Sequence, residues 1–140
     1  AFLPSTWAYS GSALCGLCIR DSGSGKLVCF GVGGSSSSME TVGVNYSSAT
    51  AAAGAATGWP SNRHCYDSPL IFLKYTDNLS TTRTISFSHD GVTWTQMLSI
   101  SRTDYLTPNQ IGIFVNSYGG YASVGSSSDT GMTVLSWKQY

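Results

Sequence analysis

Apolar and polar positions alternate along most of the chain, which is the pattern of half-buried β-strands. The strand-like segments are short, rich in β-branched and aromatic residues, and bounded by Gly, Pro, Asp, Asn or Ser. They cover residues 13–20, 27–32, 70–75, 83–88, 92–100, 111–116 and 132–138. Because no helical pattern separates them, the sequence predicts an all-β antiparallel sandwich or barrel.

The stretches between these strands are read as loops. Residues 47–58, SSATAAAGAATG, contain many alanines, but Gly54 interrupts them and no large apolar residue gives them a face to bury. We expect a loop there, with at most a short helical turn. The segments GVGGSSSS and GGYASVGSSSDTG are expected to form surface loops at the ends of the sandwich.

Two hairpins have a predictable register. Asp90-Gly91 suits the centre of a two-residue turn, which would place Phe87 opposite Trp94 and Ile85 opposite Gln96. One face of this hairpin would then belong to the core. The residues expected to be largely buried are Phe87, Trp94, Leu98, Ile111, Ile113 and Val115.

The second hairpin is centred on Gly23-Ser24 in RDSGSGKL. This register makes Cys18 and Cys29 direct cross-strand neighbours, at about the separation of a disulfide or slightly beyond it. A reducing compartment would leave the pair as thiols, whereas export or oxidation could join them. We expect Cys15 and Cys65 to take no part.

Length and charge narrow the function classes. The 140 residues suit one domain, and seven Lys and Arg balance seven Asp and Glu, so no basic field favours nucleic acid. No apolar run approaches the roughly 20 residues needed to span a bilayer, and the opening AFLPSTWAYSGSAL lacks the basic start of a signal peptide. Nucleic-acid binding and membrane insertion are therefore not expected.

Three segments carry a resemblance to a known family. GLCIRDSGSGKLVCFGVG, SFSHDGVTWTQMLSISRTDYLTPNQIGIFVNS and the closing MTVLSWKQ resemble the concanavalin A-like lectin/glucanase sandwich found as a module in bacteriophage structural proteins. The resemblance spans roughly residues 13–138 and implies a jelly-roll sandwich displayed on the virion surface, in a tail, fibre or capsid-surface protein. It also implies multiple copies, other virion proteins as partners, and a possible host-surface glycan as ligand.

Catalytic residues do not carry over from the enzymes of this fold. Those enzymes place carboxylates on one strand as E-x-D-x-E, whereas this chain has a single glutamate, Glu40. Glycoside hydrolysis needs two facing carboxyl groups, one with a raised pKa, but the acids here are scattered and mostly at turns. There is also no G-x-S-x-G elbow to support a nucleophilic serine beside His64 or His89. We therefore expect a protein that is not an enzyme.

A zinc site is the competing interpretation of the cysteines. Cys15 and Cys18 have the C-x2-C spacing, and His64 precedes Cys65. If residues 13–20 form a strand, however, Cys15 and Cys18 point to opposite faces, unless Gly16 bends the strand. No metal or cofactor is expected, and buried or half-buried thiols are the simpler interpretation.

Aromatic residues in loops support binding. Flat rings beside amides and hydroxyls suit the faces and hydroxyls of sugars. The glycan-binding candidates are Trp59, Tyr66, Asn116, Tyr118 and Tyr121. The same rings could instead cap the sandwich or pack against another copy.

Two functions therefore remain open for a lectin-like domain over residues 13–140, preceded by an extension or docking segment over residues 1–12. One is a glycan-binding host-adhesion module. The other is a purely structural capsid-decoration or assembly protein whose loops and N-terminal segment bind neighbouring virion subunits.

Overall fold

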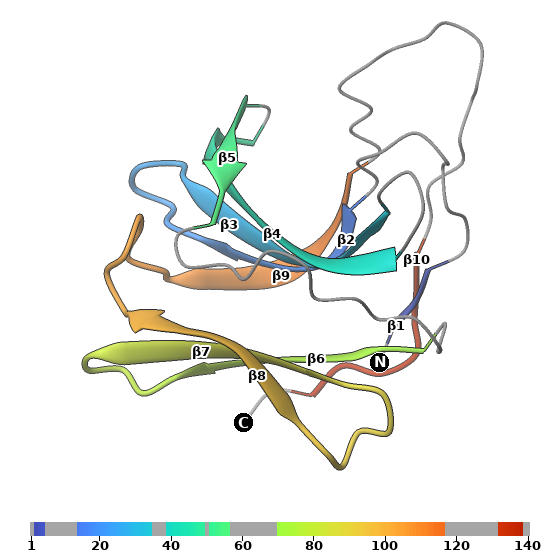
Figure 1. Ribbon diagram of the computed structural model, residues 1–140. Helices are drawn as coiled ribbons and strands as arrows, with labels where there is room; N and C mark the ends of the chain where they lie inside the picture. The colour runs from blue at the N-terminus through green and yellow to red at the C-terminus, as the bar shows by residue number, and fades with distance from the viewer. Residues whose placement is uncertain are drawn as a thin grey trace, which may run out of the picture.

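The computed structural model describes residues 2–4, 14–34, 39–49, 51–56, 70–116 and 132–138, which contain strands and no helix. Figure 1 shows them as two facing layers of sheet, as predicted for an antiparallel sandwich. The strands are β1 (Phe2–Pro4), β2 (Leu14–Arg20), β3 (Leu27–Gly34), β4 (Met39–Ser48), β5 (Ala51–Ala55), β6 (Phe72–Asp77), β7 (Thr82–Ser88), β8 (Thr95–Ser101), β9 (Gln110–Asn116) and β10 (Met132–Val134).

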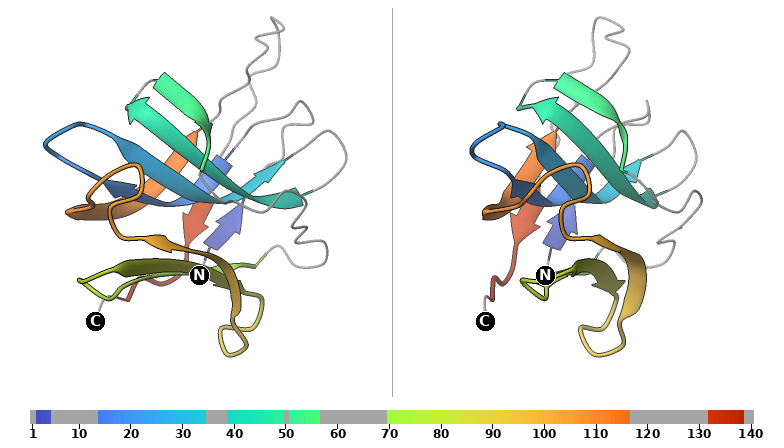
Figure 2. Two further views of the ribbon diagram at one scale, coloured as in Figure 1. Left: turned by 60° about the vertical axis from the view of Figure 1, so that its left-hand side comes forward. Right: turned by 90° about the vertical axis from the view of Figure 1, so that its left-hand side faces the viewer.

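The first layer is a five-stranded antiparallel sheet in the order β5-β4-β3-β2-β9, and the second is a three-stranded antiparallel sheet in the order β6-β7-β8. A short antiparallel pair joins β1 near the N-terminus to β10 near the C-terminus. Figure 2 shows this pair beside the two layers. The predicted strand over residues 132–138 is thus confined to its first three residues, Met132–Val134.

The main core lies between the two layers. Alternate residues of β2 and β3 face inward, and they meet apolar residues from the three-stranded sheet. Phe30 of β3 is fully buried and its ring lies 6.2 Å from that of Tyr75 on β6. The buried members are Leu17, Ile19, Val28, Phe30, Val32, Ala56, Ile71, Ile85, Met97, Leu98 and Leu106.

The three-stranded layer is too narrow to cover the five-stranded one. A Cβ built on Gly16 of β2 would lie 3.0 Å from Leu73 of β6, and the Thr41 hydroxyl of β4 lies 4.0 Å from the sulfur of Met97 on β8. The smaller sheet therefore spans β2 to β4 and stops short of β9.

The prediction of a buried β9 is wrong for this reason. Ile111, Ile113 and Val115 share the inward side of the sheet with Ile19, Leu17 and Cys15, their partners on β2. They are nevertheless 37%, 46% and 45% exposed, because no strand of the second layer lies opposite them in the described chain. The alternation was interpreted correctly as a strand, but an edge position cannot be read from alternation alone.

The hairpin between β2 and β3 has the predicted register. Cys18 pairs with Cys29, Ile19 with Val28 and Arg20 with Leu27. The Asp21 carboxylate organises the loop by accepting hydrogen bonds from the Gly23 amide at 2.9 Å and the Ser24 hydroxyl at 2.7 Å.

The hairpin between β7 and β8 has a different register from the one predicted. Phe87 pairs with Thr95 instead of Trp94, and a bulge then places Ile85 opposite Leu98 instead of Gln96. The Asp90 carboxylate accepts hydrogen bonds from the amides of Val92 and Thr93 at 2.8 and 2.7 Å, which closes a wider loop than a two-residue turn.

This wider loop changes the burial of the hairpin. Leu98 is buried, as predicted, and Phe87 is half-buried against the core. Trp94, expected in the core, precedes β8 and is only half-buried, with the Lys74 ammonium 4.3 Å from its ring centroid.

Three strands were missed. β1 lies in the segment that was expected to be an N-terminal extension, β4 was not predicted, and β5 occupies the alanine-rich segment that was interpreted as a loop. All five residues of β5 are exposed and its pairing with β4 shifts register twice. A strand that buries no side chain lacks the alternation on which the prediction depends.

Candidate binding surfaces

Three loops meet at one end of the sandwich, on the left in Figure 1. They connect β2 to β3, β6 to β7, and β8 to β9. The Asn109 amide N–H donates to the Arg20 carbonyl at 3.0 Å, and the Arg102 amide N–H donates to the Thr81 carbonyl at 2.8 Å. The β8–β9 connection is thereby tied to both sheets.

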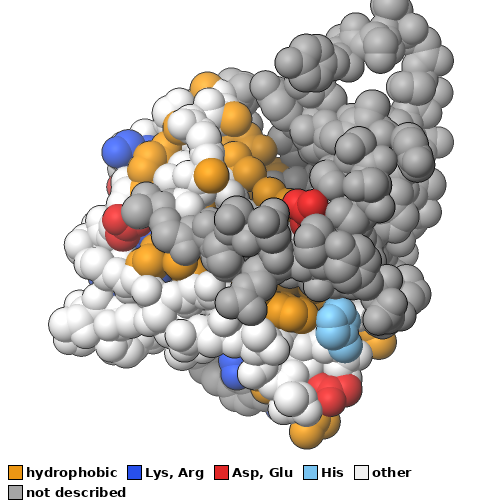
Figure 3. Space-filling model, viewed as in Figure 1, with side chains coloured by type: hydrophobic (Ala, Val, Ile, Leu, Met, Phe, Trp, Pro, Cys, Tyr) orange, Lys and Arg blue, Asp and Glu red, His pale blue; other side chains and the backbone are white. Residues whose placement is uncertain are grey.

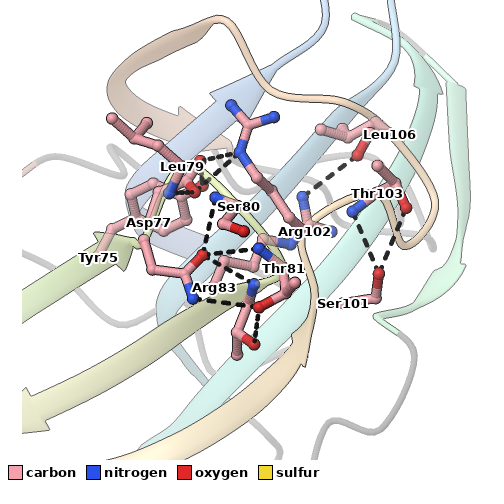
Figure 4. Close-up of polar contacts among 12 residues, drawn as sticks. Tyr75, Asp77, Leu79, Ser80, Thr81, Arg83, Ser101, Arg102, Thr103 and Leu106 are labelled. Carbon is pink, nitrogen blue, oxygen red and sulfur yellow. Dashed lines mark hydrogen bonds and ion pairs between the residues drawn. The ribbon is translucent and has the colours of Figure 1, made fainter.

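The β6–β7 loop is built by its own side chains (Figure 4). The Asn78 side-chain oxygen accepts hydrogen bonds from the amides of Ser80, Thr81 and Thr82 at 3.0, 2.9 and 2.9 Å. The Asp77 carboxylate accepts a hydrogen bond from the Leu79 amide at 2.8 Å. Its two oxygens also lie 2.9 and 3.0 Å from Arg102 Nε, with which it forms an ion pair. Polar groups that satisfy one another in this way make a rigid loop.

A buried arginine anchors this end from within. Arg83 is 1% exposed, and its guanidinium donates to the carbonyls of Asp104 at 2.5 Å and Leu106 at 3.5 Å. Burial lowers its pKa, while nearby Tyr75, Asp104 and Asp77 act in the opposite direction. Burial, followed by the charge of Asp77, raises the pKa of the Tyr75 hydroxyl to about 12. Arg83 thus holds the β8–β9 connection onto the sheet, a structural role that the sequence did not reveal.

Three acids of the described chain, Asp21, Asp77 and Asp90, have structural partners. Hydrogen bonds from Ser24 and Gly23 lower the pKa of the Asp21 carboxyl, and those from Val92, Thr93 and Ser88 lower the pKa of Asp90. Asp77 forms the ion pair with Arg102. A glycosidase acid needs a raised pKa and a facing second carboxylate, so Asp21 and Asp90 are poor candidates.

The predicted thiol pair lies on the outward face of the five-stranded sheet. Cys18 and Cys29 are 8% and 2% exposed and form a small second cluster with Tyr46. Phe114 packs against this cluster, and its ring lies 6.1 Å from that of Tyr46 in an edge-to-face arrangement. The hydrogen bond with Cys29 lowers the pKa of the Cys18 thiol and raises that of Cys29.

The register places Cys15 on the opposite face from Cys18. Burial raises the pKa of the Cys15 thiol to about 11, so it is a poor nucleophile and a poor metal ligand. Within the described ranges, no three His, Cys, Asp or Glu side chains group as a metal site. His64 and Cys65, the other members of the proposed zinc set, lie outside those ranges.

Most glycan-binding candidates also fall outside the described residues, namely Trp59, Tyr66, Tyr118 and Tyr121. Asn116 is the last residue of β9, where it pairs with Leu14. β5 and β9, which lead into the segments with these aromatics, both run toward the end of the sheet away from the 21–26 loop.

A surface that the sequence analysis missed is the apolar row on β9. Ile111, Ile113 and Val115 lie on a strand whose second edge has no partner in the described chain. Leu135 and Trp137 are 52% and 46% exposed. In the right-hand view of Figure 2, the segment that carries them lies on the same side of the sandwich as β9. The signal available in the sequence was the lack of any charge in QIGIFVN.

Figure 3 shows the types of side chain on the face of the molecule that is drawn in Figure 1. Its visible charged side chains are few and stand apart, and apolar side chains gather mainly over β5, whose residues are largely alanine.

A search of the described residues for a long apolar helix that could cross a membrane finds none. Comparison of the chain with protein-family models, with curated proteins and with solved structures gives no match.

Proposed function

We propose that the chain is a non-enzymatic, lectin-like binding module of a bacteriophage structural protein, displayed on the virion, whose ligand is a host-surface glycan. The observation that carries the proposal is the structural role of three carboxylates within an antiparallel sandwich. Asp21 and Asp90 accept hydrogen bonds that stabilise their loops, and Asp77 forms an ion pair with Arg102. The resemblance of residues 13–138 to phage lectin-like modules supplies the virion context.

The glycan part of the proposal depends on the loop aromatics. Carbohydrate-binding sites use side chains with flat aromatic rings and side chains with amide or hydroxyl groups. In the sequence, these candidates, Trp59, Tyr66, Tyr118 and Tyr121, follow β5 and β9, two strands that run toward the same end of the sheet.

A glycan array probed with the purified chain tests this function. We expect binding to a restricted set of glycans, reduced by Trp59→Ala or Tyr121→Ala and unchanged by Val92→Ala, a control at a loop residue that is 81% exposed. A parallel assay should show no release of reducing sugar from bacterial polysaccharides. Absence of binding to any glycan would contradict the ligand, and hydrolysis would contradict the non-enzymatic function.

The exposed row on β9 favours a second candidate, a structural protein that assembles with neighbouring subunits. Aliphatic side chains at an open sheet edge suit a protein partner better than a sugar.

A further inference from the structure

We propose that β9 is a homodimer interface, at which two copies of this chain pair their β9 strands antiparallel about a twofold axis at Ile113. The inference develops the assembly candidate by naming its partner, and it does not depend on glycan binding.

β9 differs from the other edge strands of the two large sheets. β5 is irregular, with two register shifts and Gly54 at φ 128°, and such irregularity protects an edge from pairing. β6 exposes Lys74 and β8 exposes Gln96 and Ser99. β9 pairs with β2 in an unbroken register over its whole length and carries no charge, proline or bulge.

The sequence of β9 is complementary to itself. In an antiparallel pair centred on Ile113, this residue meets its own copy and Ile111 meets the partner's Val115. The exposed apolar row would then continue across the axis onto the second copy, covering side chains that are otherwise in water.

The other face of the strand fits in the same register. Phe114 would lie opposite the partner's Gly112, and a Cβ built on Gly112 has no heavy atom within 4 Å. The large ring therefore meets open space instead of a second side chain. At the two ends of the pair, Gln110 of one copy would lie opposite Asn116 of the other in the strand register.

A second copy is favoured over an unrelated strand because this pattern repeats under a twofold rotation. Self-complementary surfaces are the requirement for a closed, isologous dimer, the commonest oligomer of soluble proteins. Leu135 and Trp137 are also exposed, and the segment that carries them lies on the same side of the sandwich as β9.

Sedimentation velocity of the purified chain tests the proposal. We expect a dimer at about 0.1 mM protein, where an interface with a dissociation constant near 10 µM is mostly occupied. Ile113→Lys places two ammonium groups opposite each other at the axis and should raise the dissociation constant at least about tenfold. Because Ile113 is 46% exposed, the lysine can stay in water and the protomer should keep its circular dichroism spectrum.

The matched control is Val92→Lys, which adds the same charge at an exposed apolar residue in the β7–β8 loop and should leave the dimer intact. Ile113→Cys should cross-link to its own copy on mild oxidation, well above the level that the wild-type cysteines give. A monomeric wild type, a dimer that survives Ile113→Lys, equal loss with Val92→Lys, or open-ended oligomers would each overturn the twofold β9 interface.

A glycan array probed with the Ile113→Lys monomer separates the two proposals. Retained glycan recognition with lost dimerisation assigns the functions to different surfaces. Loss of dimerisation in a chain that never bound glycan contradicts the adhesion function alone.

Discussion

Cys18 on β2 and Cys29 on β3 lie directly opposite each other, in register across the hairpin, and both are reduced. Their burial on the outward face of the sheet comes from the rings of Tyr46 and Phe114 rather than from the second layer. The pair thus combines a separation close to that of a disulfide with restricted access to solvent.

The first prediction is that this pair forms an intramolecular disulfide slowly. Treatment with hydrogen peroxide should oxidise the two thiols to one disulfide, with the two electrons and two protons reducing the peroxide to water. Closing the short hairpin loop should stabilise the fold by about 2 kcal/mol or less, because strain offsets part of the entropic gain. Mass spectrometry of the digested protein should find a peptide linked through residues 18 and 29.

Access controls the rate of this reaction. Phe114→Ala should speed disulfide formation, since it removes one of the two covering rings, whereas Cys15→Ser should leave the rate unchanged. A linkage that joins Cys15 to Cys18 would contradict the strand register. Equal rates with and without Phe114 would show that the ring does not protect the thiols.

The second prediction concerns Arg83. Arg83→Ala should cost about 3 to 5 kcal/mol of unfolding free energy, because it removes a buried side chain and leaves the carbonyls of Asp104 and Leu106 without their donor. Arg83→Lys should recover little, since an ammonium cannot reproduce the two-pronged geometry of the guanidinium. Urea unfolding measures the loss, and hydrogen exchange should show faster opening of residues 102–109.

Arg102 is the matched control for Arg83. Its ion pair with Asp77 is partly exposed, with side chains 23% and 12% accessible, so Arg102→Ala should cost only about 1 kcal/mol. Equal losses for the two variants would contradict the anchoring role of Arg83.

The third prediction is a pH dependence due to Asp90. Its hydrogen bonds hold the folded-state pKa below the unfolded value of about 3.9, so its contribution is present above that pH and is lost as the pH falls through the folded pKa. Asp90→Ala should therefore destabilise the protein at pH 7, and the difference from wild type should shrink as the pH falls below about 4. Urea unfolding at both pH values checks this, and a pH-independent difference would contradict it.

The fold was largely predictable because most strands bury one face and so alternate visibly. The register between β2 and β3 followed from the position of RDSGSGKL, where Asp21 holds the turn. The β7–β8 register did not follow, because the Asp90 side chain competes with the two-residue turn for the backbone amides. The exposure of Ile113 depends on the width of the opposing sheet, which local pattern does not encode.

The candidate surfaces were less predictable than the fold. The position of the two thiols depends on one hairpin, and the predicted pairing of Cys18 with Cys29 across that hairpin was confirmed. Arg83 and the β9 row depend on contacts between residues far apart in sequence, so neither could be recognised from its neighbours. The aromatic candidates for glycan binding stay a prediction.

The fourth prediction compares two glycines on the central sheet. Gly31 of β3 faces Gly16 of β2, and a Cβ on Gly31 would lie 2.0 Å from the Cys15 carbonyl oxygen and 2.8 Å from Gly16 Cα. Both neighbours are backbone atoms, so the strands must separate to admit a methyl group. Gly31→Ala should cost about 3 kcal/mol, at the upper end for overpacking of a well-packed site.

Gly112 of β9 provides the matched control, since a Cβ there has no atom within 4 Å and its φ is not in the left-handed region. Gly112→Ala should leave the stability unchanged or raise it by up to about 1 kcal/mol, because alanine restricts the unfolded chain without strain in the native strand. Thermal and urea unfolding of the two variants, measured at a protein concentration low enough to keep the chain monomeric, give the comparison. Equal tolerance at both positions would contradict the close approach of β2 and β3 at the Gly16–Gly31 pair. The packing of Leu73 of β6 against Gly16 would then have to be revised.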